Sequence, residues 1–464
     1  MAGLFQALEV GKRALLSSQV YLQTIGHNIA NVNTPGYSRQ RVHISATRPS
    51  DSPYGPIGTG MGVDSIRHVR DLFLGEQFRQ TSQSVGEWTY KEKVLSQLET
   101  VFAEPADNTL NERLNEFWNS WDTLSQHAES MTSRKAVLGA AERLVTDFRE
   151  LSRQLTDLRD SIDGDLTAMT QEVNRLSTEV AMLNQQIVTQ ELDGSSSNDL
   201  RDIRDQLIDE LSLLVNTNTI EDARGGVRVL IGSLEIVNGS NATAIDTETH
   251  LVEGGIRHRL IWEGTSVELT CGSGELRGLL DSRDILIPKY LEELDALAAS
   301  VVYQVNSIHS TGYGLDGIDG RDFFDSTYTT ASSMRINQEL ELAPEKLAAS
   351  ASGETGDGTI ALNMQGLRNE RVMVNGTSTI NDYYNSMIGD LGLESHQAMS
   401  FASNYKLLVH QVENSRQSIQ GVSLDEEMAS MIKHQHAYEA AARVITVMDE
   451  ALDVVISRMG IVGR

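Results

Sequence analysis

The chain has 464 residues, enough for roughly two to four domains, and its 38 basic and 65 acidic residues give a net charge of −27 with histidine neutral. A surface this acidic repels phosphate backbones and anionic lipid, which argues against nucleic acid as a partner. Only 7 prolines and one cysteine are present, so long helices are permitted while an internal disulfide or a Cys-rich zinc site is excluded.

The first predicted element is a helix that ends near Asn31. Of the eight positions at alternating spacings of four and three from 4 to 29, six are Leu or Ile, which places them in one stripe along a helix. Thr34 precedes Pro35 and is pushed out of the α region, and Gly36 supplies a turn. Polar residues interrupt the stripe, so it contains neither a secretory h-region nor a membrane span, and composition alone indicates a cytoplasmic protein. The stripe consists of Leu4, Leu8, Leu15, Leu22, Ile25 and Ile29.

Further helices are predicted at about 70–102 and 108–126, followed by a long rod over 137–187. Of fifteen heptad-spaced positions in the rod only one is polar, and a continuous helix of this length spans roughly 80 Å. Gly164 stands beside the polar position, Asp165. We therefore expect any break or bend of the rod at Gly164.

The composition changes after Val215. Glycines become frequent between 225 and 278, and apolar residues alternate with polar ones, which predicts a small antiparallel β domain inserted in the rod. Helices resume at about 274–311, with an interruption at Pro288, and at about 394–420. The segments 312–320 and 350–358 are expected to be loops.

The last predicted helix carries a second heptad seam without a proline or glycine, as a coiled coil requires. Two terminal helices with narrow stripes need a partner, and each is the nearest candidate for the other. The seam positions are Leu424, Met428, Met431, Tyr438, Ile445, Leu452, Ile456 and Met459.

The resulting fold class is mainly α with an inserted all-β domain, in an elongated multi-domain subunit whose N- and C-terminal coiled-coil helices pack together. The terminal domain is expected to combine 1–33 with 421–464. The helical rod, with short β connectors, is assigned to 34–214 and 274–420, and the β domain to 215–273.

No catalytic or metal-binding constellation emerges from the residue pattern. Asp316, Asp319 and Asp322 stand three apart, where an EF-hand loop needs ligands at alternate positions, so a solvated turn is expected. His68 has Asp64 and Asp71 nearby and suggests a surface ion pair. We therefore expect no enzyme activity, no cofactor and no metal.

Several motifs resemble those of the bacterial flagellar axial proteins, the rod, hook and hook-associated proteins. One follows the first helix, in 29–41, and its Gly-Tyr-Ser-Arg-Gln ending is more similar to hook-associated members than to hook or rod proteins. Others lie at 421–428, 438–446, 198–207 and 274–283. The motif residues are Asn31, Asn33, Thr34, Pro35, Gly36, Tyr37, Ser38, Arg39, Gln40, Asp425, Glu426 and Glu427.

The resemblance implies an extracellular structural subunit of the flagellum, exported unfolded through the flagellar type III apparatus without a cleaved signal. It implies a junction ring between hook and filament, with the hook protein, a second junction protein (hook-associated protein 3) and lateral copies of the chain as partners, and an export chaperone at the C-terminal helix. The terminal seams would form the assembly interface. Because lone helices are marginal in water, both ends are expected to be disordered in the monomer.

Two alternatives stay open. A hook or rod protein would carry similar ends, but a hook protein predicts an extended self-polymer, whereas a junction protein forms a limited ring. A secreted protein could also combine axial-type ends with a ligand-binding or catalytic β insert. That alternative predicts a carboxylate pair or metal cluster in 215–275, and the sequence shows no motif for either.

Overall fold

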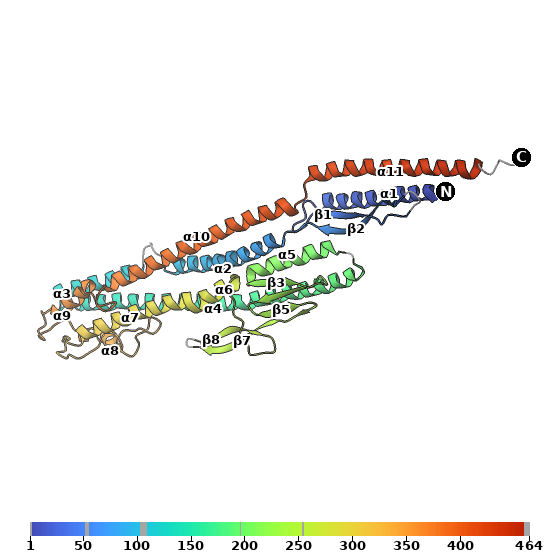
Figure 1. Ribbon diagram of the computed structural model, residues 1–464. Coiled ribbons are helices and arrows are strands. Elements are labelled where there is room, and N and C mark those ends of the chain that lie inside the picture. Colours follow the sequence, from blue (N-terminus) through green and yellow to red (C-terminus); the bar gives the residue numbers. More distant parts are fainter. Residues whose placement is uncertain (1, 52–54, 103–108, 195, 253–254, 459–464) are drawn as a thin grey trace.

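The computed structural model describes residues 2–51, 55–102, 109–194, 196–252 and 255–458 and shows an elongated molecule (Figure 1). Helices α1 (Ala2–Ala30) and α11 (Leu424–Arg458) pack side by side at one end, where both termini lie. Together with the hairpin of β1 (Gln40–Ala46) and β2 (Met61–His68) they form what we call the terminal tier. The remaining elements form the rod. The predicted class, mainly helical with terminal helices packed together, is confirmed.

The rod is built along α4, which runs unbroken over 131–190. Ser130 caps its start by accepting the backbone N–H of Ser133. No break occurs at Gly164, because one glycine in a helix costs only about 1 kcal/mol and the buried Ile162 and Leu166 hold the helix on either side of it. The helices packed against α4 are α2 (Leu72–Phe102), α3 (Leu110–Gln126), α5 (Asn198–Leu214), α6 (Glu275–Asp281) and α7 (Ile287–His309), and α10 (Ile380–Gln420) packs along α2.

The remaining helix boundaries differ from the expected ones in two places. A π-helical turn over Ser282–Leu286 separates α6 from α7, so the interruption expected at Pro288 falls just before it. Helix α10 begins at Ile380 and not near 394, with Thr379 as its N-cap. The short helices are α8 (Gln338–Leu342), α9 (Thr359–Gly366) and 3-10 turns at Glu191–Asp193, Pro344–Lys346 and Leu367–Asn369.

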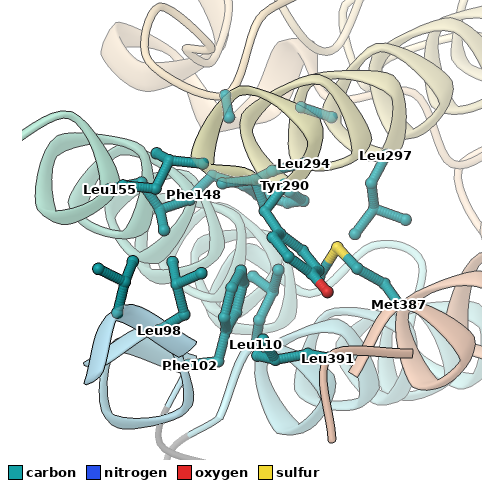
Figure 2. Packing of buried hydrophobic residues seen from close by; sticks show 14 of the residues in the cluster. Leu98, Phe102, Leu110, Phe148, Leu155, Tyr290, Leu294, Leu297, Met387 and Leu391 are labelled. Carbon is teal, nitrogen blue, oxygen red and sulfur yellow. The ribbon is translucent and has the colours of Figure 1, made fainter. Parts of the chain in front are cut away.

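One continuous hydrophobic core runs through the rod. In Figure 2, side chains from α2, α3, α4, α7 and α10 converge, among them Phe102, Phe148, Tyr290 and Leu391. Burial of this size is the main favourable contribution to folding of the rod. The core therefore couples segments from both halves of the chain.

The inserted β segment contains two separate antiparallel sheets. The four-stranded sheet has the order β3-β4-β5-β6, and β7 pairs with β8 as a hairpin. Asn184 of α4 donates to the carbonyls of Val227 and Gly239, which anchors the first sheet. The strands are β3 (Thr217–Glu221), β4 (Val227–Ile231), β5 (Leu234–Asn238), β6 (Asn241–Ala242), β7 (Ile245–Val252) and β8 (Gly255–Trp262). No helix in the described ranges is long and apolar enough to cross a membrane.

Candidate assembly site in the terminal tier

Helices α1 and α11 run antiparallel. The rings of Tyr21 and His434 stack with centroids 3.9 Å apart, and Asn28 donates to Glu427 at 3.2 Å. Towards the other end, a Cβ on Gly11 would lie 3.1 Å from Cγ1 of Ile445. The absence of a side chain at Gly11 therefore permits the close approach of the two helices there.

The predicted stripe on α1 faces its neighbours, but the predicted seam on α11 is rotated. Ile25 is buried and Leu4, Leu8, Leu15, Leu22 and Ile29 are half-buried. On α11, Leu452 is buried and Met431 and Ile445 are half-buried, whereas Leu424, Met428, Tyr438 and Ile456 are exposed. Met459 lies outside the described residues.

Polar anchors explain this rotation. Glu427 and Ala441 are buried and His434 is half-buried, each one position before a heptad position of α11 (428, 442 and 435). The hydrogen bond from Asn28 to Glu427 and the ring stack on His434 turn these positions towards α1. As an intrachain seam, the heptad set was wrong at Leu424, Met428, Tyr438 and Ile456, which are exposed.

Large apolar side chains along α11 face solvent in the single chain, and we call this set the apolar row. Ile456 is 70% exposed and Met428 52%. Exposed apolar rows of this kind mark interaction surfaces, because leaving them in water costs free energy. The row consists of Leu424, Met428, Ile432, Tyr438, Val444, Val447, Val454 and Ile456.

Charge is distributed unevenly between the terminal tier and the rod. Basic residues exceed acidic ones in 1–71, and acidic residues exceed basic ones by the same number in 421–464. The whole acidic surplus of the chain therefore lies in 72–420. A neutral tier can approach copies of itself without the repulsion that the rod would meet.

The motif loop after α1 packs at the junction between the terminal tier and the rod. The Tyr37 hydroxyl donates to Asn28 at 2.8 Å, and burial, together with Asp199 and Asp202, raises the pKa of Tyr37. Gly36 has φ +75°, and a Cβ there would lie 2.9 Å from Oε1 of Gln206. Asn33, Thr34, Pro35 and Gly36 are exposed and line a groove of about 1180 Å³, and Asn31 is half-buried.

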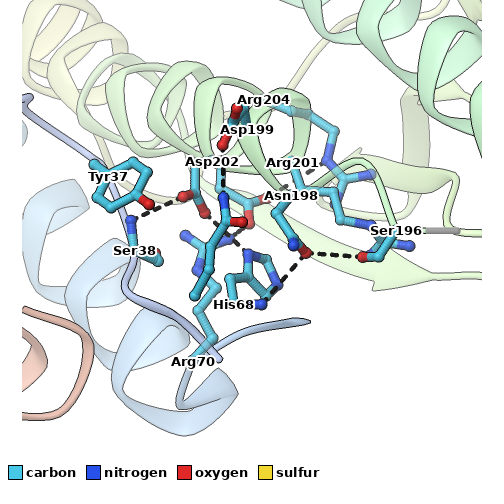
Figure 3. Close-up of polar contacts among 12 residues, drawn as sticks. Tyr37, Ser38, His68, Arg70, Ser196, Asn198, Asp199, Arg201, Asp202 and Arg204 are labelled. Atoms are coloured by element: carbon cyan, nitrogen blue, oxygen red, sulfur yellow. Dashed lines mark hydrogen bonds and ion pairs between the residues drawn. The ribbon is translucent and has the colours of Figure 1, made fainter. Parts of the chain in front are cut away.

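Helix α5 holds this loop through carboxylates (Figure 3). Asp202 accepts the backbone N–H of Ser38 at 2.8 Å and contacts Nδ1 of His68 at 3.0 Å. Gln40 donates its side-chain amide to Asp199 at 2.7 Å, and Asp199 also lies 3.2 Å from Nε2 of His27. The surface ion pair expected for His68 was wrong, since its partner is the buried Asp202, far from Asp64 and Asp71 in sequence.

The acidic face continues along α5 and binds arginines from three other segments. Arg70 pairs with Asp205, and burial lowers the pKa of Arg70. Asp209 contacts Nε of Arg79 at 2.8 Å and Nη1 of Arg416 at 2.5 Å. Sequence reasoning missed these residues, although the spacing of the aspartates by three and four places them on one helix face.

Arg39 fixes the turn between α10 and α11. Its Nη1 lies 2.6 Å from Glu426 and its Nε 2.6 Å from Glu427, and its backbone N–H donates to the Gln420 carbonyl. Burial lowers the pKa of Arg39, but the two glutamates outweigh it and raise the pKa overall. Asp425, the third acidic residue of this motif, is exposed.

The described residues contain neither a cluster of metal ligands nor a reactive thiol. No group of three His, Cys, Asp or Glu side chains in these ranges could hold a metal ion. Cys271 is buried, and burial raises the pKa of its thiol to about 12, so no thiolate forms near neutral pH. Asp316 pairs with Arg321 at 2.6 Å. The polar contacts described above attach the motif loop, the rod and the start of α11 to one another.

Three family models match successive parts of the chain. Residues 8–37 match the flagella basal body rod protein family, 95–324 the helical domain of flagellar hook-associated protein FlgK, and 414–458 the C-terminal family of flagellar basal body rod FlgEFG proteins. The terminal matches cover most of α1, the motif loop and α11. The molecule is thus a structural protein of the flagellar axial class.

Similarity to individual proteins identifies the family within this class. Flagellar hook-associated protein 1 of Bacillus subtilis is 32% identical, with all of both chains covered. The Salmonella typhimurium protein of the same name is 24% identical, with 96% of this chain and 98% of that one covered. The chain belongs to the flagellar hook-associated protein 1 family. The solved flagellar hook junction protein FlgK of Burkholderia pseudomallei shares the fold, with a TM-score of 0.66 at 15% identity over 75% of this chain and all of that one.

Proposed function

We propose that this chain forms the junction ring between the flagellar hook and the filament, with the terminal tier as the inner tube of the ring and the rod outside it. The observation that carries the proposal is the exposed apolar row on α11, with Ile456 70% exposed and Met428 52% exposed. A neighbouring copy that covers this row gains hydrophobic free energy at each contact.

The distribution of charge and shape supports the same arrangement. Because the terminal segments together are neutral, they can be packed tightly around a channel. The acidic rods would then project outward, where like charges are farther apart and water screens them. The elongated form, with both termini at one end, suits a subunit that contributes its ends to a tube (Figure 1).

The partners of such a ring are the hook protein on one side, the second junction protein (hook-associated protein 3) on the other, and lateral copies of the chain. An export chaperone would cover the apolar row of α11 before export. Delivery would use the flagellar type III apparatus, and the mature subunit would be extracellular. The acidic rod is unsuited to nucleic acid or to insertion into membranes.

Electron microscopy of flagella from a strain that lacks the chain tests the proposal. A junction subunit predicts complete hooks without filaments, and flagellin shed into the medium. Restoring the unaltered chain should restore filaments. Filaments of normal number and length on the deletion strain would contradict the proposal, and loss of the hooks themselves would favour a hook or rod role.

A further inference from the structure

Two arginines face each other across the hairpin of the terminal tier. Arg41 on β1 is the cross-strand partner of Arg67 on β2, and both side chains are exposed. Neither forms an ion pair with any described residue, although acidic residues outnumber basic ones, 65 to 38, in this chain. Like charges directly opposite each other destabilise a sheet, so folding of the single chain does not account for this pair.

The neighbouring arginines show what an intrachain role looks like here. Arg39 pairs with Glu426 and Glu427, and Arg70 pairs with Asp205. Both neighbours have side chains that are mostly buried. Arg41 differs because the flanking positions of β1, Gln40 and Val42, are the buried ones, and alternation along the strand turns Arg41 away from the interior.

The complementary charge lies at the start of α11. Of the three acidic residues in its first turn, Glu426 and Glu427 bind Arg39 of the same chain. Asp425 is exposed and has no ion-pair partner in the described ranges. The terminal tier thus contains one exposed carboxylate, Asp425, and two exposed arginines, Arg41 and Arg67, that form no ion pair within the described ranges.

The two charges lie at the same level along the tier but on different elements. The backbone N–H of Arg39, two residues before Arg41, donates to Gln420, which directly precedes the turn into α11. Helix α1 packs between α11 and the hairpin, which lie on its opposite sides (Figure 1). Neighbouring copies in a ring are related by a rotation about the ring axis, which does not shift them along that axis. The hairpin of one copy can therefore meet α11 of the next at the same height. Such head-to-tail contacts form a ring when the rotation between successive copies closes.

From this geometry we infer that Arg41 and Arg67 form a binding site for the Asp425 carboxylate of the adjacent copy in the ring. The inference rests on the proposed function and gives it a residue-level lateral contact. The cross-strand pair presents two guanidinium groups to one carboxylate, a charge-assisted arrangement that also fixes orientation. It is destabilising in the free subunit and satisfied only on assembly.

The test is a charge exchange in cells whose own copy is deleted. Arg67→Asp and Asp425→Arg alone should each lower the number of filaments per cell by about tenfold. Combined in one chain, they should restore filaments, because every copy then presents complementary charges again. Arg67→Thr should lower filament number too, while the purified subunit melts at an unchanged or higher temperature, since repulsion with Arg41 is removed.

Three outcomes would overturn the inference. The first is an unchanged filament number in both single reversals, and the second is failure of the combined chain to restore filaments. The third is loss of filaments in Arg67→Asp with normal filaments in Asp425→Arg, which would assign the arginine pair to a carboxylate of a different protein. All three leave the deletion phenotype of hooks without filaments intact, so they are distinguishable from failure of the proposed function.

Discussion

The carboxylate of Asp202 accepts the backbone N–H of Ser38 at 2.8 Å, although 164 residues separate the two in sequence. The contact attaches the loop that leaves α1 to a helix of the rod. Ser38 is fully buried and Asp202 is 4% exposed, so water cannot replace either partner. The orientation of the terminal tier on the rod therefore depends on a small number of polar contacts with α5.

Removing this carboxylate should loosen the tier without unfolding the rod. Asp202→Ala leaves the Ser38 N–H buried without an acceptor, which costs about 1–3 kcal/mol. Hydrogen exchange should show faster exchange at residues 28–42 and unchanged exchange in α4. Asp157→Ala on the exposed face of α4 is the matched control. Equal protection of 28–42 in both variants would show that Asp202 does not hold the tier.

Arg39 should be needed at the turn between α10 and α11. Its partner Glu427 has a side chain only 3% exposed, so Arg39→Ala strands a buried carboxylate and should destabilise the tier by about 3 kcal/mol. Thermal unfolding of the purified chain measures the loss. The double variant Arg39→Met with Glu427→Gln should recover much of it, because no uncompensated charge remains. A double variant as unstable as Arg39→Ala would contradict the ion-pair explanation.

Sequence periodicity predicted the secondary-structure elements far better than it predicted the contacts between them. The stripes of α1, α4 and α11 were visible because helix faces repeat locally along the chain. The start of α10 at Ile380 was missed, because Gly389 and Gly392 weaken the helical pattern there. The packing of α1 against α11 was predicted because each helix carries an apolar stripe that needs a partner.

The polar junction could not be predicted in the same way. Asp199 and Asp202 were noticed only as part of a motif, since their partners Ser38, Gln40 and His68 lie more than a hundred residues away. The rotation of α11 was missed for a related reason. Heptad analysis ranks apolar positions, whereas Asn28 and Tyr21 select the polar Glu427 and His434.

His309 should make the far end of the rod sensitive to acid. Its Nδ1 donates to the Arg321 carbonyl at 2.7 Å and its Nε2 accepts the Ala348 N–H at 2.9 Å. Burial lowers the pKa of His309 from 6.5 to about 4. A proton on Nε2 would face the Ala348 N–H, so the folded chain disfavours protonation.

The sign of the pH effect follows from the lowered pKa. Between pH 6.5 and 4 the unfolded chain binds more protons at this ring, so the stabilisation present above pH 6.5 is lost as the pH falls, by up to about 3 kcal/mol. Denaturant unfolding of the unaltered chain and of His309→Gln at pH 7 and pH 4 measures it. The difference between the two should shrink at pH 4. A difference independent of pH would assign the effect to other groups.

The terminal helices should be less protected than the rod in the free subunit. Each is covered on one side only, and the apolar row of α11 faces water. Hydrogen exchange on the monomer should be fast over 4–29 and 424–458 and slow over the buried positions of α4, and assembly should slow it. Slow exchange throughout both terminal helices of the monomer would sink the expectation that they order on assembly.

The exposed row of α11 gives the sharpest test of ring formation. Ile456→Asp and Met428→Asp place a charge where a neighbouring copy would bury it, which is costly without a partner. Both side chains are exposed in the single chain, so the helix pair within the chain should survive and the melting temperature should change little. Filament number in a deletion strain should fall to near that of the deletion. Met182→Asp on the rod, at a residue 51% exposed, is the matched control and should leave filaments intact. Normal filaments from Ile456→Asp would mean that the row is not the lateral seam of the tube.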